Sequence, residues 1–223
     1  MTKSPRKIGV IISGGNPWEI VFCFYLFEKQ GLQRAPITVP LPTRSENETQ
    51  YEVDLAGGAP VNLADIKATN LDALLIPGGS ILFDTLGDYW QAGNNFKVLD
   101  DLKNILRGVY RLGKPIGAFG ASSILVTRAL QGITRTGVVV TVGSDPKMQA
   151  AIASMGGQAV VTRPGEVVLD QTNKLVTTGG EFGTRRPAEV FEACENLIVG
   201  LSELIESATT PKLSGSQNPS SAE

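Results

Sequence analysis

The chain has 223 residues, enough for one large domain with its own hydrophobic core. Its 20 basic and 22 acidic residues give a net charge of −2, so no basic excess is present to bind a nucleic-acid backbone. Histidine is absent, which excludes Ser-His and Cys-His nucleophile pairs and imidazole metal ligands. The two cysteines, Cys23 and Cys194, form no C-x-x-C pair, so we expect no metal site and no cofactor.

The N-terminal residues MTKSPRK contain no apolar signal core. The longest apolar run, residues 20–27, is much shorter than the ~20 residues that span a bilayer. We therefore expect a soluble protein that does not insert into a membrane. The expected location is the cytoplasm, or the interior of a mitochondrion or plastid if a transit peptide has been removed.

Strand-like and helix-like segments alternate along the chain. The first are an apolar strand at residues 7–12 and a helix that follows Asn16, has Pro17 in its first position and ends at Gly31. Residues 42–70 are polar and irregular, which indicates a hairpin or flap. Further strands are expected at residues 37–41, 72–76, 115–119, 137–143, 158–161, 166–169 and 174–178, and further helices at residues 96–112, 122–130, 146–155 and 187–206.

This alternation predicts an α/β fold with a mostly parallel sheet. No internal repeat or linker divides the chain, so residues 1–206 are expected to form a single domain. Residues 207–223, SATTPKLSGSQNPSSAE, lack apolar periodicity and are predicted to form a disordered tail.

Residues 114–130, KPIGAFGASSILVTRAL, predict a strand, a sharp turn and a helix. In α/β enzymes such a turn often holds a nucleophile, because it pushes one side chain out at the carboxyl edge of the sheet. The apex here is Gly120, which has no side chain. The sequence therefore has no side chain for catalysis at position 120, where the motif would place a nucleophile.

Several motifs resemble those of the ThiJ/PfpI superfamily of class I glutamine amidotransferase-like proteins, and within it the enhancing-lycopene-biosynthesis (ElbB-type) branch. They are VIISGG with Glu19 in the following helix, LDALLIPGG, GKPIGAFGAS, and the run AAIASMGGQAVV…VVLDQTNKLVTTGG. The resemblance covers most of residues 7–206. It implies a flavodoxin-like sandwich with helices on both faces of the sheet.

The resemblance also implies a site. Members of the superfamily typically have a cysteine at the elbow, a glutamate from the first helix and backbone amides that form an oxyanion site. Their activities include glyoxalase-type hydration of dicarbonyls, deglycation, and peptidase and amidase chemistry. Here the glutamate corresponds to Glu19, the elbow cysteine to Gly120, and the neighbouring turns to Gly14, Gly15, Gly78, Gly79 and Ala121.

Each candidate also has a purely structural interpretation. Glu19 fits either a capping box or a group facing a pocket. Ser122 and Ser123 fit helix capping better than nucleophilic roles, because no histidine is present to activate them. The cysteines lie in apolar helices and are interpreted as buried and structural. The glycine pairs at 14–15, 78–79 and 179–180 fit tight turns better than a phosphate cradle.

The first helix is apolar almost all round, which suits either full burial or a subunit interface, and we expect a homo-oligomer. For the whole chain we expect a non-catalytic ThiJ/PfpI-like protein with a binding, regulatory or complex-assembly role. A small anionic or carbonyl ligand is the expected occupant of any retained pocket, and participation in a larger protein complex is a further possibility. The alternative is a small-molecule enzyme, a glyoxalase-type lyase or a hydrolase, that uses Glu19 and backbone amides.

Overall fold

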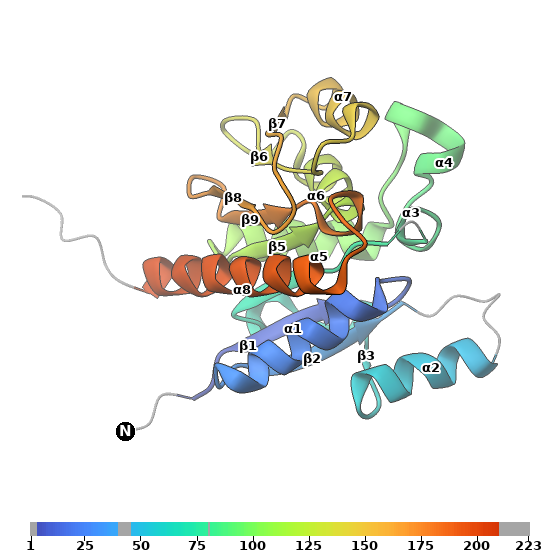
Figure 1. Cartoon of the computed structure of the whole chain (residues 1–223), viewed down its shortest axis with the longest axis vertical. Helices are drawn as coiled ribbons and strands as arrows, with labels where there is room; N and C mark the ends of the chain where they lie inside the picture. Colours follow the sequence, from blue (N-terminus) through green and yellow to red (C-terminus); the bar gives the residue numbers. More distant parts are fainter. Residues whose placement is uncertain (1–3, 40–45, 80, 210–223) are drawn as a thin grey trace, which may run out of the picture.

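A computed structural model describes residues 4–39, 46–79 and 81–209 (Figure 1). Within these residues seven strands form one sheet in the order β3-β2-β1-β4-β5-β9-β8. Neighbouring strands run parallel, except that β8 pairs antiparallel with β9 at one edge. The strands are β1 (Lys7–Ile11), β2 (Gln33–Thr38), β3 (Val61–Asn62), β4 (Ala73–Ile76), β5 (Ile116–Phe119), β8 (Val167–Asp170) and β9 (Leu175–Thr178).

Helices cover both faces of this sheet. One face is covered by α1 and α8, which lie side by side in Figure 1, and the other by α5 and α6. The helices are α1 (Pro17–Lys29), α2 (Glu46–Ala56), α3 (Leu82–Thr85), α4 (Tyr89–Ala92), α5 (Asp100–Arg111), α6 (Ala121–Leu130), α7 (Pro146–Ser154) and α8 (Pro187–Thr209). The predicted flavodoxin-like α/β sandwich is thereby confirmed. Among the described residues no helix is both long and apolar enough to cross a membrane.

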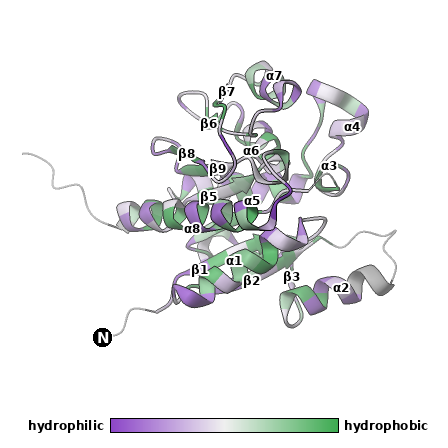
Figure 2. Ribbon diagram, in the orientation of Figure 1, coloured by the Kyte–Doolittle hydropathy of each residue, from purple (hydrophilic) through white to green (hydrophobic). Residues whose placement is uncertain are grey.

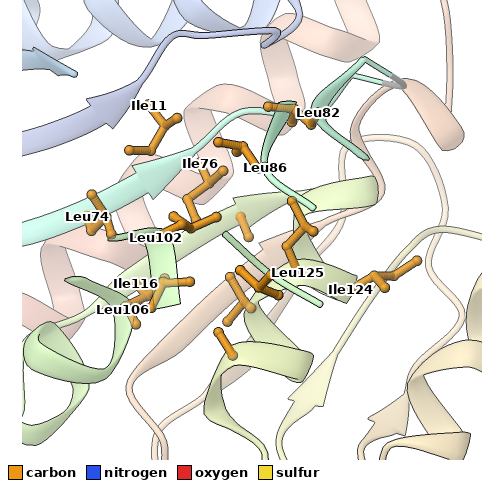
Figure 3. Packing of buried hydrophobic residues seen from close by; sticks show 14 of the residues in the cluster. Ile11, Leu74, Ile76, Leu82, Leu86, Leu102, Leu106, Ile116, Ile124 and Leu125 are labelled. Atoms are coloured by element: carbon orange, nitrogen blue, oxygen red, sulfur yellow. The ribbon is translucent and has the colours of Figure 1, made fainter. Parts of the chain in front are cut away.

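The core follows from the alternation of side chains along each strand. In β4, Leu74 and Ile76 face α5 and α6, whereas Ala73 and Leu75 face α1 and α8. Figure 3 shows the layer that contains Leu74 and Ile76, in which apolar side chains from strands and helices pack against one another. Because both faces are buried, the central strands read as continuous apolar runs, which is why the sequence predicts them well.

The first helix begins and ends as its sequence predicts. The Oδ1 atom of Asn16 accepts hydrogen bonds from the backbone N–H groups of Trp18 and Glu19, and Pro17 occupies the first turn. Gly31, with φ of 66°, lets the chain leave the helix.

Several predicted boundaries are wrong. The second strand begins at residue 33 rather than 37, because β1 supplies ladder partners for the polar residues Gln33 and Arg34, and it ends at Thr38; residues 40 and 41 of the predicted strand lie outside the described residues. Within the described part of residues 42–70 there is no hairpin but α2 and the short β3, while residues 42–45 lie outside the described residues. Helix α8 continues to Thr209, so residues 207–209, which were predicted to belong to the tail, are helical, and residues 210–223 lie outside the described residues.

The predicted strand at 137–143 does not join the main sheet. Its centre forms β6 (Val139–Val140), which pairs with β7 (Gln158–Ala159) in a separate two-stranded sheet. Helices α3 and α4 were also not predicted, because four-residue helices leave almost no periodic signal.

Candidate functional site

The turns that follow β1, β4 and β5 meet at the carboxyl edge of the sheet, and they pack backbone against backbone. The N–H of Asn16 donates to the carbonyl of Gly78 at 2.7 Å. A Cβ placed on Gly79 would lie 2.6 Å from the Gly14 carbonyl oxygen, and one placed on Gly15 would lie 3.3 Å from Cβ of Pro77. Glycine is required here by close approach, which is the structural interpretation of these pairs.

Glu19 lies between these turns and is fully buried. Its Oε2 atom accepts a hydrogen bond of 2.5 Å from the backbone N–H of Gly78. A Cβ on Gly180 would approach Oε1 to 2.7 Å, so the carboxylate lies between the turn after β4 and the loop after β9. The cap of α1 is provided by Asn16, and the Glu19 side chain reaches across to another segment of the chain.

Gly120 is the apex of the turn between β5 and α6. Its φ of 45° and ψ of −113° lie in a region that residues with a Cβ rarely adopt. Its N–H donates to the Thr178 carbonyl at 2.8 Å. A Cβ on Gly120 would lie 2.8 Å from the Gly179 carbonyl oxygen and 3.0 Å from Cδ2 of Phe182, so the space above the apex is occupied.

The loop between β9 and α8 supplies what occupies that space. Phe182 belongs to a single 3₁₀ turn, residues 180–182, and its N–H donates to the Gly179 carbonyl at 3.2 Å. Gly179 itself approaches Gly143, since a Cβ on Gly179 would lie 2.9 Å from the Gly143 Cα. Sequence reasoning noted the pair 179–180 but not Phe182, for which the only signal was its place just after that pair.

The first turn of α6 is buried. The Ser122 hydroxyl donates to the Pro77 carbonyl, which joins the elbow to the turn after β4. The Ser123 hydroxyl has no hydrogen-bond partner among the described residues. Ala121 is also fully buried. The hydrogen bond of Ser122 fits a structural role, in which it holds the start of α6 against the turn after β4.

The two cysteines face each other between α1 and α8, and both are free and fully buried. Burial raises the pKa of the Cys23 thiol, and its hydrogen bond to Cys194 and the nearby charge of Glu19 raise it further. The Cys194 thiol donates weakly to the Glu19 carbonyl, at 3.9 Å. The raised pKa keeps the Cys23 thiol protonated and unreactive. Among the described residues no cluster of His, Cys, Asp or Glu could hold a metal ion.

Comparison with known proteins gives one family match. The family described as the C-terminal domain found in long catalases matches residues 53–173, which is 121 of the 223 residues. The human protein named glutamine amidotransferase-like class 1 domain-containing protein 3, mitochondrial, is 29% identical over 148 residues, which cover 62% of this chain and 53% of that protein. The chain spans about half the length of the curated relatives it matches.

Solved structures share the fold. The isoprenoid biosynthesis protein with amidotransferase-like domain from Ehrlichia chaffeensis has a TM-score of 0.77 at 20% identity, over 88% of this chain and 99% of that one. Schizosaccharomyces pombe DJ-1 has a TM-score of 0.58 at 14% identity, over 92% of this chain and 100% of that one. These structures share the α/β fold that the ThiJ/PfpI resemblance predicts, and the name of the human relative contains the same glutamine amidotransferase-like class 1 description.

Proposed function

We propose that this chain, which belongs to the family of the C-terminal domain found in long catalases, is a non-catalytic protein that acts in binding, regulation or complex assembly. Within the ThiJ/PfpI superfamily we assign it to the ElbB-type branch, on the motifs VIISGG and GKPIGAFGAS. We infer that Gly120 stands where members of the superfamily have their nucleophile. The family description supports the proposal, since it names a C-terminal domain that is found within an enzyme.

One observation carries the proposal: position 120 has neither a side chain nor room for one. The Gly179 carbonyl oxygen and the Phe182 ring occupy the volume that a cysteine would need. The observation therefore counts against thiol catalysis at this position.

The backbone amides near the elbow support the same conclusion. The N–H of Gly78 donates to Glu19 and the N–H of Gly120 donates to the Thr178 carbonyl. An oxyanion site needs donors aimed at the reacting oxygen. These two donors already serve the fold: Glu19 accepts from the Gly78 N–H, and the Thr178 carbonyl accepts from the Gly120 N–H. We infer that Glu19 bridges segments of the chain rather than moving a proton to a substrate.

We infer that assembly involves the outer face of α1. Trp18, Val21 and Tyr25 are each about half exposed, at 48%, 50% and 52%, and lie on one side of the helix. Phe22 extends the face and packs edge-on against Phe191 of α8 at 5.4 Å. In Figure 2 the middle of α1 is coloured as hydrophobic. We propose that a second copy of the chain covers this face.

The test is a turnover assay on the purified protein with methylglyoxal and with an amidase substrate. We expect rates equal to the buffer background, for the parent protein and for Glu19→Gln alike. Turnover that Glu19→Gln abolishes would favour the alternative enzyme, and turnover that survives it would reveal chemistry elsewhere in the chain. For location we propose the cytoplasm or an organelle interior, the latter supported by the mitochondrial human relative.

A further inference from the structure

A cationic groove lies between α5, the C-terminal end of α6 and the segment before α5, away from the elbow. It encloses a cavity of about 380 Å³. Four of its lining residues are cations and one, Asp100, is an anion. On a chain with a net charge of −2 this is a marked local excess of positive charge. The cations are Lys97, Lys103, Arg107 and Arg128.

The two guanidinium groups are held in place by backbone carbonyls. Arg107 donates from Nε to the Ala129 carbonyl at 2.7 Å and from Nη2 to the Gln131 carbonyl at 3.1 Å. Arg128 donates from Nε to the Phe96 carbonyl at 2.9 Å and from Nη1 to Oε1 of Gln131 at 2.8 Å. Both side chains therefore converge on Gln131, one from α5 and one from α6.

These bonds leave one terminal nitrogen of each guanidinium without a protein partner. Among the described residues, Nη1 of Arg107 and Nη2 of Arg128 have no hydrogen-bond partner. Arg128 also lies 5.5 Å from the centre of the Phe96 ring, which fixes its plane further. A guanidinium held in this way loses little conformational entropy when an anion binds.

The cations of the groove are not paired with carboxylates. Within the described part of the chain none of the four cations forms an ion pair with a carboxylate. The first turn of α5, a helix of 12 residues, adds the positive end of its dipole next to Lys103, offset in part by Asp100 and Asp101. Four like charges around one cavity repel one another, and a bound anion would relieve that repulsion.

We propose that this groove binds a small phosphorylated molecule. A phosphate monoester carries nearly two negative charges and accepts paired hydrogen bonds from planar guanidinium groups. The cavity is at the small end of the range for ligand pockets, roughly 300–1,000 Å³, so the partner is compact. A nucleic acid would need a longer basic stripe than one groove with four cations.

The test is calorimetric titration with pyrophosphate at constant ionic strength. We expect saturable binding at one site per chain. The double variant Lys97→Gln/Lys103→Gln removes two charges whose side chains make no hydrogen bond in the described structure, and we expect it to weaken binding roughly tenfold or more. Lys147→Gln is the matched control, because it removes one exposed charge on α7 outside the groove, and it should change the affinity by less than about twofold.

Three outcomes would overturn the proposal. The first is no binding of pyrophosphate at millimolar concentration, and the second is equal binding by the double variant and Lys147→Gln. The third is tighter binding of citrate or of a short oligonucleotide than of pyrophosphate, which would assign the groove to carboxylates or to nucleic acid. Arg128→Lys keeps the charge but loses the planar fork, so weaker pyrophosphate binding by this variant supports recognition by the guanidinium.

Discussion

The Oε2 atom of Glu19 and the backbone N–H of Gly78 form a hydrogen bond of 2.5 Å that joins the first turn of α1 to the turn after β4. The carboxylate is fully buried, and its other oxygen faces Gly180, on the loop after β9. One acidic side chain therefore connects three segments that are far apart in the sequence. Its environment is that of a structural bridge in a closed site.

Removal of this bridge should destabilise the fold. In Glu19→Ala the Gly78 N–H loses its buried acceptor, so we expect the free energy of unfolding to fall by about 1–3 kcal/mol. Glu19→Gln keeps an acceptor oxygen and should lose less. Urea denaturation measures both, with Glu28→Ala on the exposed side of α1 as the control. A Glu19→Ala protein as stable as Glu28→Ala would contradict the bridging role.

The buried thiols should not react in the folded protein. Cys23 and Cys194 are fully buried, and the raised pKa of Cys23 keeps it protonated at neutral pH. We expect a disulfide reagent such as DTNB to label neither thiol in the native protein and both in urea. Rapid labelling of one thiol under native conditions would indicate local opening between α1 and α8.

The same thiol should make stability fall at alkaline pH. The pKa of Cys23 in the folded state is above the ordinary value of about 8.5, so the unfolded chain loses this proton first as pH rises. The protonated Cys23 thiol contributes fully to the free energy of unfolding below about pH 8.5. Above that pH its contribution decreases, by up to ~1.4 kcal/mol per pH unit, until the folded-state pKa is reached. Cys23→Ala should show a shallower decrease between pH 8.5 and 10, and an equally steep one would contradict the prediction.

The sequence predicted correctly those elements whose position depends on burial of apolar residues or on local capping. The runs at 73–76 and 116–119 are apolar because both faces are covered, and Asn16 and Pro17 fix the start of α1. Prediction from the sequence failed for strands whose position depends on the neighbouring strand with which they pair. Gln33 and Arg34 are in a strand only because β1 lies beside them, and Val139 and Val140 leave the main sheet to pair with β7.

Part of the geometry of the candidate site follows from the predicted parallel order of the strands. Glu19, in the helix that follows β1, and Gly78, in the turn that follows β4, lie beyond the carboxyl ends of neighbouring parallel strands, so topology brings them together. The filling of the elbow by Phe182 could not be predicted, because it depends on how a short loop after β9 folds back over β5. A single aromatic residue in a glycine-rich loop carries no periodic signal.

The α1 face should mediate self-association. Val21 is half exposed between Trp18 and Tyr25, so Val21→Glu places a charge in the centre of the apolar face without disturbing the core. We expect light scattering after size exclusion to give a dimer or larger species for the parent protein at micromolar concentration and a monomer for Val21→Glu. Val161→Glu, at an exposed position after β7, is the control and should behave as the parent. A monomeric parent protein would remove this proposal.

A thiol returned to the elbow should be costly. Gly120→Cys forces a side chain onto a backbone with φ of 45°, which costs about 1–3 kcal/mol for a residue other than glycine. The new Cβ would also meet the Gly179 carbonyl oxygen at 2.8 Å, so we expect a loss of stability near the upper end of that range. Gly120→Ala should lose a similar amount, because the strain lies in the backbone and at Cβ.

The chemistry of the returned thiol should depend on Phe182. The thiol would lie at the N-terminus of α6, where the helix dipole lowers its pKa, while the Glu19 carboxylate opposes that shift. We expect the helix end to dominate, and the ring of Phe182 to shield the thiol from alkylation. Gly120→Cys/Phe182→Ala should therefore alkylate faster than Gly120→Cys over pH 6–9, after subtraction of Cys23 and Cys194 in the parent. If Gly120→Cys is as stable as the parent protein and its thiol is equally accessible with and without Phe182, then residue 120 is not the apex of a filled elbow, and the proposal of a non-catalytic protein loses the observation that carries it.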